Sequence, residues 1–498
     1  MTISSRRIEP RVLTLDIGSS SIRVLAFDAQ AQRLEGIESR AELQLHTTVN
    51  GGSEVDADQL FALICRCIDQ ALEQLGSAAY ALQAVAVDSF VSNILGIDQA
   101  GHPITPVYTY ADTRNSHDSE LLRQQLNEHT LHQRTGCLLR SAYWPARLAW
   151  LRRTQTQTWD TVAHWITIGE YLEQRILGVA RVGYSPASWS GLLDRQKLCW
   201  DAELLDVLGI DEDHLSPLVD TSVAAHGLTA AYAERWPALA KVAWFPALGD
   251  GAAANIGSSC HNDHHIALTV GTTGALRIVR AQVDQVPDGL WCYRVDGRRA
   301  LLGGATSEGG NVFAWLQRTL QIGDPAILEK NLAAQMPDGH GLDVLPLWAG
   351  ERSPGWAGNA RASIVGMTLG TRPIDIIQAT LEAVAYRFAI IAEQLIPAEH
   401  EATLIASGGA LVHSPVWTQM IADAIGHPIL MSQEAEATSR GTAMLALESL
   451  GIIASLDQPT QAEGHIFYPD AHRNLIYKAA IERQRRLYDK LIRMTQLG

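Results

Sequence analysis

The 498-residue sequence contains no apolar run of the roughly 18 residues that a helix needs to cross a bilayer. Its first ten residues are polar and include no apolar core of a secretion signal. Positive charge is also scarce, since 39 Lys and Arg stand against 54 Asp and Glu for a formal net charge of −15. Nonspecific nucleic-acid binding needs a basic surface. We therefore expect a cytoplasmic protein with neither nucleic-acid nor membrane partners.

The six cysteines form no CxxC pair and have no histidine at zinc-finger spacing, which argues against a metal or disulfide framework. Cys65 and Cys67 fall on an amphipathic stretch, where cysteine is typical as a small core residue. What the sequence does have is the composition of a globular protein, with 47% hydrophobic and 19% charged residues. Its length predicts more than one domain.

The first half begins with an α/β pattern. Residues 12–41 alternate as three short strands, and residues 56–75 place apolar side chains on one helical face. Asp56 or Asp58 can cap that helix, and residues 84–88 predict a further strand that ends at Asp88. Strands followed by a helix and a strand indicate an α/β fold.

The second half repeats the opening motif. Residues 266–279 read as a strand, a turn of small residues and a second strand, as residues 13–24 do. Gly18 and Gly271 take equivalent places, each followed by two hydroxyl residues. A repeat spaced by about 250 residues predicts two similar domains rather than a solenoid. We place the domain boundary where the sequence becomes rich in small and apolar residues, which gives domains 1–248 and 249–498.

The two glycine turns are candidate phosphate-binding loops. Gly18 and Gly271 let a ligand approach the backbone, and the hydroxyl residues that follow them expose N–H and O–H donors. Asp16, at the end of the strand before Gly18, could hold Mg²⁺, because hard cations prefer oxygen ligands. The turn at Gly18 is neither a Walker loop nor a GxGxxG motif. An ordinary β-hairpin remains the alternative for either turn.

Asp250 stands where a helix of small residues begins. The helix dipole favours its ionised form, and phosphoryl transfer to a hydroxyl needs a positioned base. A plain helix cap is the alternative.

Two further glycine-rich loops follow, at residues 303–311 and 408–409. Bare backbone there would let a base and ribose lie close, although the second loop could be a common strand–helix connection. Residues 350–356 form a loop that could line a cleft or be a surface turn.

Together, and in this order, these segments resemble the FGGY carbohydrate kinases, which include glycerol, xylulose, ribulose and gluconate kinases. The resemblance runs from about Val12 to Gly451. It implies two actin-like, RNase H-type ATPase domains with an active cleft between them, MgATP as the phosphoryl donor, and a homodimer as the assembly.

The resemblance also assigns roles. Asp250 matches the catalytic base and Asp16 the metal-associated carboxylate. The residues that match nucleotide-binding positions are Gly18, Ser19, Ser20, Arg23, Gly271, Thr272, Thr273, Gly304, Gly309, Gly310, Asn311, Gly408, Gly409, Ala410 and His413. Glu308 departs from the pattern, because an amide is expected there.

On the substrate side the matching positions are Val91, Ser92, Tyr110, Asp112, Arg114, Trp144, Arg147 and Asp250. Several short segments of the sequence are most similar to those of gluconate kinases, so we expect D-gluconate to be converted to 6-phosphogluconate. Arg114 and Arg147 are the candidate carboxylate ligands, with a plain salt bridge as the alternative for each. Val91-Ser92 replaces the Trp-His typical of gluconate kinases, which could admit another sugar.

Three alternatives remain open. The chain could be a xylulose, ribulose or other polyol kinase. It could also be a non-catalytic sugar- or nucleotide-binding regulator, or an actin- or chaperone-like ATPase.

Overall fold

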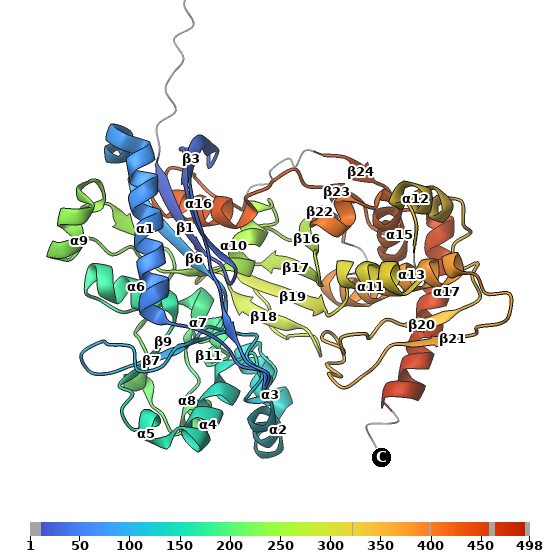
Figure 1. Cartoon of the computed structure of the whole chain (residues 1–498), viewed down its shortest axis with the longest axis horizontal. Coiled ribbons are helices and arrows are strands. Elements are labelled where there is room, and N and C mark those ends of the chain that lie inside the picture. The colour runs from blue at the N-terminus through green and yellow to red at the C-terminus, as the bar shows by residue number, and fades with distance from the viewer. Residues whose placement is uncertain (1–10, 321, 398–399, 458–463, 494–498) are drawn as a thin grey trace, which may run out of the picture.

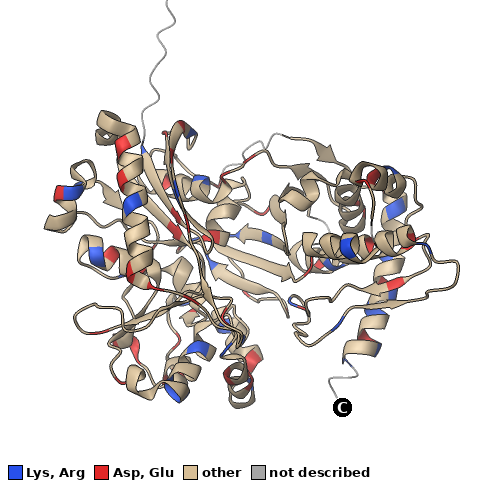
Figure 2. Ribbon diagram, in the orientation of Figure 1, with Lys and Arg blue, Asp and Glu red and all other residues tan. Residues whose placement is uncertain are grey.

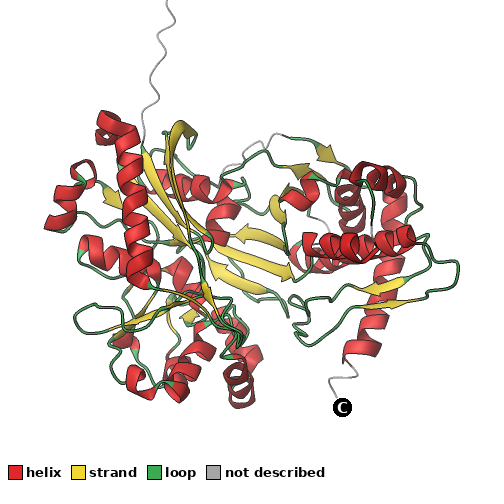
Figure 3. Cartoon of the chain, in the orientation of Figure 1, coloured by secondary structure: helices red, strands yellow, loops and turns green. Residues whose placement is uncertain are grey.

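The computed structural model describes residues 11–320, 322–397, 400–457 and 464–493. It contains two large sheets, one in each half of the chain, with helices packed around them (Figures 1 and 3). Acidic and basic side chains are interspersed over both halves (Figure 2). No helix in the described ranges is both long and apolar enough to cross a membrane.

The first sheet has the order β14-β6-β1-β2-β3, with β15 also paired to β6. Strands β1, β2 and β3 form the antiparallel meander that the alternating pattern predicts. Strand β6 adds parallel to β1. Helix α1 (Ala57–Leu75) covers this sheet with its apolar face, and Asp56 caps it by accepting from the Gln59 N–H. The strand bounds are β1 (Val12–Ile17), β2 (Ser21–Phe27), β3 (Arg33–Glu42), β6 (Ala84–Ser89), β14 (Ala243–Trp244) and β15 (Leu248–Gly249).

A largely helical insertion lies between β6 and β14. It forms a small core of its own around Trp144, Leu148 and Trp165. In Figure 1, α2, α4, α5 and α8 lie below the first sheet, and α6 and α9 lie to its left. Its helices are α2 (Ser116–Gln125), α3 (Glu128–Thr135), α4 (Trp144–Thr154), α5 (Thr156–Trp159), α6 (Ile168–Leu177), α7 (Tyr184–Ser190), α8 (Ala202–Leu208) and α9 (Ala230–Arg235).

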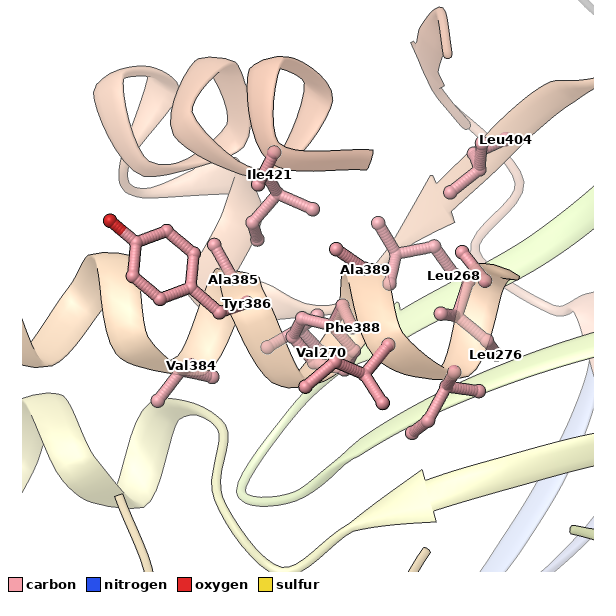
Figure 4. Close-up of a cluster of buried hydrophobic side chains, with 14 of the residues drawn as sticks. Leu268, Val270, Leu276, Val384, Ala385, Tyr386, Phe388, Ala389, Leu404 and Ile421 are labelled. Carbon is pink, nitrogen blue, oxygen red and sulfur yellow. The ribbon is translucent and has the colours of Figure 1, made fainter. Parts of the chain in front are cut away.

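The second sheet repeats the first, with the order β18-β19-β17-β16-β22-β23-β24. Its β16–β17 hairpin is antiparallel and β22 adds parallel to β16, just as β6 adds to β1. Helix α13 (Pro373–Leu395) packs on this sheet through Phe388 and Ala389 (Figure 4). The strands are β16 (His265–Val270), β17 (Gly274–Arg280), β18 (Trp291–Arg294), β19 (Ala300–Thr306), β22 (Thr403–Ser407), β23 (Ile429–Met431) and β24 (Ile466–Phe467).

Two short helices link the halves. Helix α10 (Asp250–Gly257) crosses α16 (Ala437–Ser449), which also packs on β1 and β6 of the first sheet. The crossing depends on glycine, because a Cβ on Gly441 would lie 1.9 Å from the Ala253 carbonyl oxygen. A late segment of the chain thus packs on the first sheet. The boundary between residues 248 and 249 stays a prediction.

Candidate active site

The predicted phosphate loops are the turns of two equivalent hairpins, β1–β2 and β16–β17. The Gly18 N–H donates to the Ser21 carbonyl at 2.9 Å, and the Gly271 N–H donates to the Thr273 carbonyl at 3.0 Å. A Cβ on Gly18 would lie 2.9 Å from the Ser21 oxygen, so this turn is too tight for a side chain. Ser19, Ser20, Thr272 and Thr273 follow the two glycines, where their N–H and O–H groups can serve as anion donors.

Three carboxyl groups meet between the hairpins. Asp16 ends β1, and the parallel register places Asp88 of β6 directly beside it. Asp250 opens α10, close enough to Asp16 for repulsion between the two carboxylates to raise the pKa of Asp250. Asp88 is fully buried, and burial followed by the neighbouring Asp16 raises its pKa well above the ordinary value.

Asp88 is a site residue that our sequence reasoning missed. Its Oδ2 accepts from the Thr442 hydroxyl of α16 at 2.8 Å, whereas its Oδ1 has no partner among the described residues. An aspartate inside an otherwise apolar strand is the one sequence signal that could have marked it.

Asp250 has the environment of a general base. Its Oδ1 accepts from the Gly251 N–H at 2.7 Å at the first turn of α10. Desolvation raises the pKa of Asp250 to about 6, with Asp16 adding repulsion while the Gly251 N–H and Arg277 oppose the rise. The carboxylate is therefore ionised at neutral pH yet more basic than an ordinary aspartate, which suits proton removal from a hydroxyl.

Arg23 holds Asp16 in place. Its Nη2 donates to Asp16 Oδ2 at 2.5 Å and its Nη1 donates to Glu436 Oε2 at 2.8 Å. Glu436 precedes α16, so Arg23 joins the first sheet to a segment from the second half of the chain. Its contact with phosphate stays a prediction.

A cavity of about 820 Å³ adjoins the second hairpin. This volume is typical of a small-molecule site. It brings together seven of the predicted nucleotide-binding residues with a wall of α11 (Gly310–Leu320), α12 (Pro325–Ala333), α14 (Gly409–Val412) and α15 (Pro415–Ile425). The seven are Gly271, Thr272, Gly310, Asn311, Gly409, Ala410 and His413.

The other predicted glycines shape this region without lining the cavity. Gly408 has φ +105°, and a Cβ there would lie 2.3 Å from the Val270 oxygen. Gly309 packs against Thr273 in the same way. Gly304 lies inside β19, where a Cβ would meet the side chains of Leu290 and Ile391. The structure therefore places Gly304 in the core.

Glu308, which replaces the expected amide, is buried and accepts from the Ala349 N–H at 3.1 Å. Desolvation raises the pKa of Glu308 to about 7, with that N–H and Arg387 opposing the rise. Near neutral pH much of this carboxyl is protonated. It can then donate as well as accept a hydrogen bond, as an amide does.

The predicted substrate cations are already paired. Arg147 Nη1 donates to Asp112 Oδ1 at 2.7 Å, and Arg114 binds both Asp112 and Glu54 at 2.5 Å. Asp112 is fully buried, and these two arginines hold its pKa low against the opposing effect of burial. The network fixes the loop that carries Tyr110, which is 44% exposed. Direct contacts of these residues with substrate stay predictions.

Val91 and Trp189 lie beside Gly249, the residue before Asp250, and Ser92 contacts Trp189. The sequence did not single out Trp189, and substrate contact by Val91 and Ser92 stays a prediction. A Cβ on Gly249, the residue before Asp250, would lie 2.7 Å from Trp189 Nε1 and 2.9 Å from Val91 Cγ1. The Ser92 hydroxyl donates to the Trp189 carbonyl at 2.7 Å.

Trp189 comes from α7, and its ring stacks on Tyr293 with centroids 3.5 Å apart. Its buried Nε1 has no hydrogen-bond partner in the described part of the chain. Trp144, also predicted here, instead donates from Nε1 to the Asn93 carbonyl at 3.0 Å.

The comparisons with known proteins identify the family. The N-terminal domain model of the FGGY family of carbohydrate kinases matches residues 11–257, and the C-terminal domain model matches residues 266–450. The chain belongs to the FGGY family of carbohydrate kinases. It is therefore a phosphotransferase that acts on a sugar hydroxyl, with ATP as the expected second substrate.

The sequence identity to individual relatives is about 25%. A gluconokinase of Bacillus subtilis is 25% identical over 470 residues, which covers 92% of this chain and 91% of that protein. Two solved structures from Lactobacillus acidophilus, a ligand-bound xylulose kinase and a gluconate kinase, each have a TM-score of 0.89 at 24% identity. Each alignment covers 96% of this chain and 98% of the solved chain. These structures confirm the expected two-domain FGGY fold.

Proposed function

We propose that this chain transfers the γ-phosphoryl group of MgATP to a hydroxyl of a sugar acid, with D-gluconate giving 6-phosphogluconate as the best-supported reaction. The observation that carries the proposal is the position of Asp250. A carboxyl with a pKa raised to about 6 lies between two donor-rich hairpins, one of which adjoins a nucleotide-sized cavity.

The proposed chemistry is a direct transfer. The sugar hydroxyl docks against Asp250, which takes its proton as the new oxygen–phosphorus bond forms. The bond between the γ-phosphorus and its bridging oxygen breaks, and ADP leaves. N–H and O–H donors of the Gly18 and Gly271 turns stabilise the charge on the phosphate oxygens.

The carboxylates beside the first hairpin fit a divalent cation. Asp16 and Asp88 lie side by side, and Asp88 Oδ1 is buried with no partner among the described residues. Hard cations such as Mg²⁺ prefer carboxylate oxygens. Asp16 would hold the ion, with Asp88 beside it. When bound, Mg²⁺ would supply neutralisation of phosphate charge.

Gluconate is favoured over other sugars by two of the relatives, the B. subtilis gluconokinase and the L. acidophilus gluconate kinase. A pentulose is the alternative within the family, because the xylulose kinase structure is equally similar and Val91-Ser92 departs from the gluconate-kinase pattern. A non-catalytic regulator is disfavoured by Asp250 and both hairpin turns. Cytoplasmic location and a homodimer stay predictions.

The test is ADP release by the purified protein with MgATP and a panel of gluconate, xylulose, ribulose and glycerol, with Asp250→Asn as the comparison. We expect turnover on gluconate that Asp250→Asn loses. Turnover on xylulose alone would support the kinase activity and identify xylulose, in place of gluconate, as the substrate. ADP release that ignores every sugar, or an active Asp250→Asn, would refute the proposal.

A further inference from the structure

Strand β17 presents one charged side chain to the face where the base lies. Leu276 and Ile278 on this strand pack into the core beneath α13. Because successive strand residues point to opposite faces, Arg277 between them points the other way. Val279 shares that face and packs with Tyr293 and with Ala252 of α10, the helix that Asp250 opens. Arg277 thus lies on the side of the sheet that carries Asp250.

No carboxylate of the described residues lies within ion-pair distance of the Arg277 guanidinium. Its Nε is buried without a hydrogen-bond partner, and no ion pair within 4.0 Å involves Arg277 in the described part of the chain. Guanidinium groups carry only donors, so burying one without acceptors is costly. Desolvation, and to a lesser degree Arg352, lowers the pKa of Arg277, while Asp250 opposes the fall. Such a group calls for an anionic ligand.

Three other arginines on the substrate side already pair with carboxylates of the protein. Arg114 and Arg147 are committed to Asp112, and Arg140 is committed to Glu128. Arg352 is exposed in the loop 350–356 and close enough to Arg277 to lower its pKa. Arg352 therefore adds positive charge beside Arg277.

We propose that Arg277 is the specificity-determining residue of this kinase, and that it recognises a carboxylate on the sugar. The inference rests on the proposed function, since it assumes that a sugar hydroxyl docks at Asp250. A carboxylate accepts two parallel hydrogen bonds from one guanidinium, which fixes the position and the charge of the substrate together. Arg352 adds positive charge nearby, and the unpartnered Trp189 Nε1 supplies a donor for a hydroxyl.

One rival role for the same guanidinium is contact with the transferred phosphoryl group. The two roles predict different kinetics. A carboxylate receptor acts only on substrates that carry the anion, whereas a phosphate ligand acts on every sugar and on ATP.

The experiment compares Arg277→Gln with Arg280→Gln in the full chain. Arg280 lies on the same strand and donates to the Leu395 carbonyl instead. We expect Arg277→Gln to lose on the order of 100-fold in kcat/KM for gluconate, the worth of a charged hydrogen-bonded pair. Turnover of neutral glucitol or xylulose and the KM for ATP should stay within a few-fold of the parent. Arg280→Gln should match the parent throughout, and Arg277→Lys should recover part of the loss.

Calorimetric titration of gluconate without nucleotide supplies a second measure. The affinity should fall with Arg277→Gln and not with Arg280→Gln. An equal loss on acids and neutral sugars with a raised KM for ATP would assign Arg277 to phosphate and overturn the inference. A parent enzyme that prefers neutral sugars would also overturn the inference, although the proposed kinase activity would still hold. A parent without sugar-dependent ADP release would instead overturn the proposed function.

Discussion

Replacing Asp250, the proposed base, should stabilise the protein while abolishing its activity. Asp250 is partly buried, and desolvation raises its pKa from the ordinary 3.8 to about 6. A folded-state pKa above the unfolded value means that the folded protein holds the proton more tightly. Stability is therefore highest below about pH 4, falls as the pH rises from there to about 6, and stays reduced above it.

The size of the effect follows from that shift. Two pKa units correspond to about 3 kcal/mol, or about 2 kcal/mol after allowance for the partial exposure of the side chain. Asn cannot ionise, yet its Oδ1 can still accept from the Gly251 N–H. Asp250→Asn should thus gain about 2 kcal/mol at pH 7.5, which is roughly 4–8 °C in Tm for a domain of this size.

Thermal and urea unfolding of both proteins at pH 5.0 and pH 7.5 measure the effect. The advantage of Asp250→Asn should shrink clearly at pH 5.0. Asp375→Asn is the matched control of opposite sign, because the hydrogen bond from Arg372 lowers the Asp375 pKa. That variant should lose stability at pH 7.5. An Asp250→Asn protein that is less stable than the parent at pH 7.5, or equally shifted at both pH values, would refute the reasoning.

Three further outcomes are expected. Stopped-assay pH profiles of kcat/KM for the sugar should rise with pH and level off above about 6, as Asp250 ionises; a flat profile between pH 5 and 7 would contradict its role as base. Gly441→Ala should lose about 3 kcal/mol or more in urea melts, because its Cβ would lie 1.9 Å from the Ala253 oxygen, whereas Gly358→Ala, with open space around it, should change little. Glu308→Gln should bind nucleotide as tightly as the parent at pH 6.5. Because the pKa of Glu308 is about 7, the parent's nucleotide affinity should weaken by pH 8, and that of Glu308→Gln should not. Fluorescent-nucleotide titration measures both affinities, and parallel affinity–pH curves for the two proteins would exclude that protonation effect.

Features set by local sequence were predictable. Period-2 alternation gives both hairpins, and a glycine with two hydroxyl residues marks each turn. Helix α15 begins at a local signal too, with Pro415 in its first turn and the Trp417 N–H donating to Ser414 Oγ. Such patterns depend on neighbouring residues, so one sequence carries enough information to identify them.

Features set by packing over long sequence distances were not predictable. Asp88 meets Asp16 only because β6 adds parallel to β1 in that register, after an intervening helix. Trp189 reaches Gly249 from α7 of the helical insertion, where no motif marks it. Arg114 and Arg147 are candidate substrate ligands by their residue type, and the sequence does not reveal that Asp112 pairs with both. A cation is available for a ligand only when folding leaves it without a counter-ion.

Three polar groups around Asp250 lack a partner in the part of the chain that the structure describes. Asp88 Oδ1, Trp189 Nε1 and Arg277 Nε are all buried without partners among the described residues, and all three side chains lie near Asp250. Each such group costs on the order of 1–3 kcal/mol in the free protein. A cation beside Asp88, a sugar hydroxyl at Trp189 and a carboxylate at Arg277 would satisfy them together. Binding of metal, nucleotide and sugar acid should then raise Tm by more than the sum of their separate effects, since each ligand completes a site whose charges the others share.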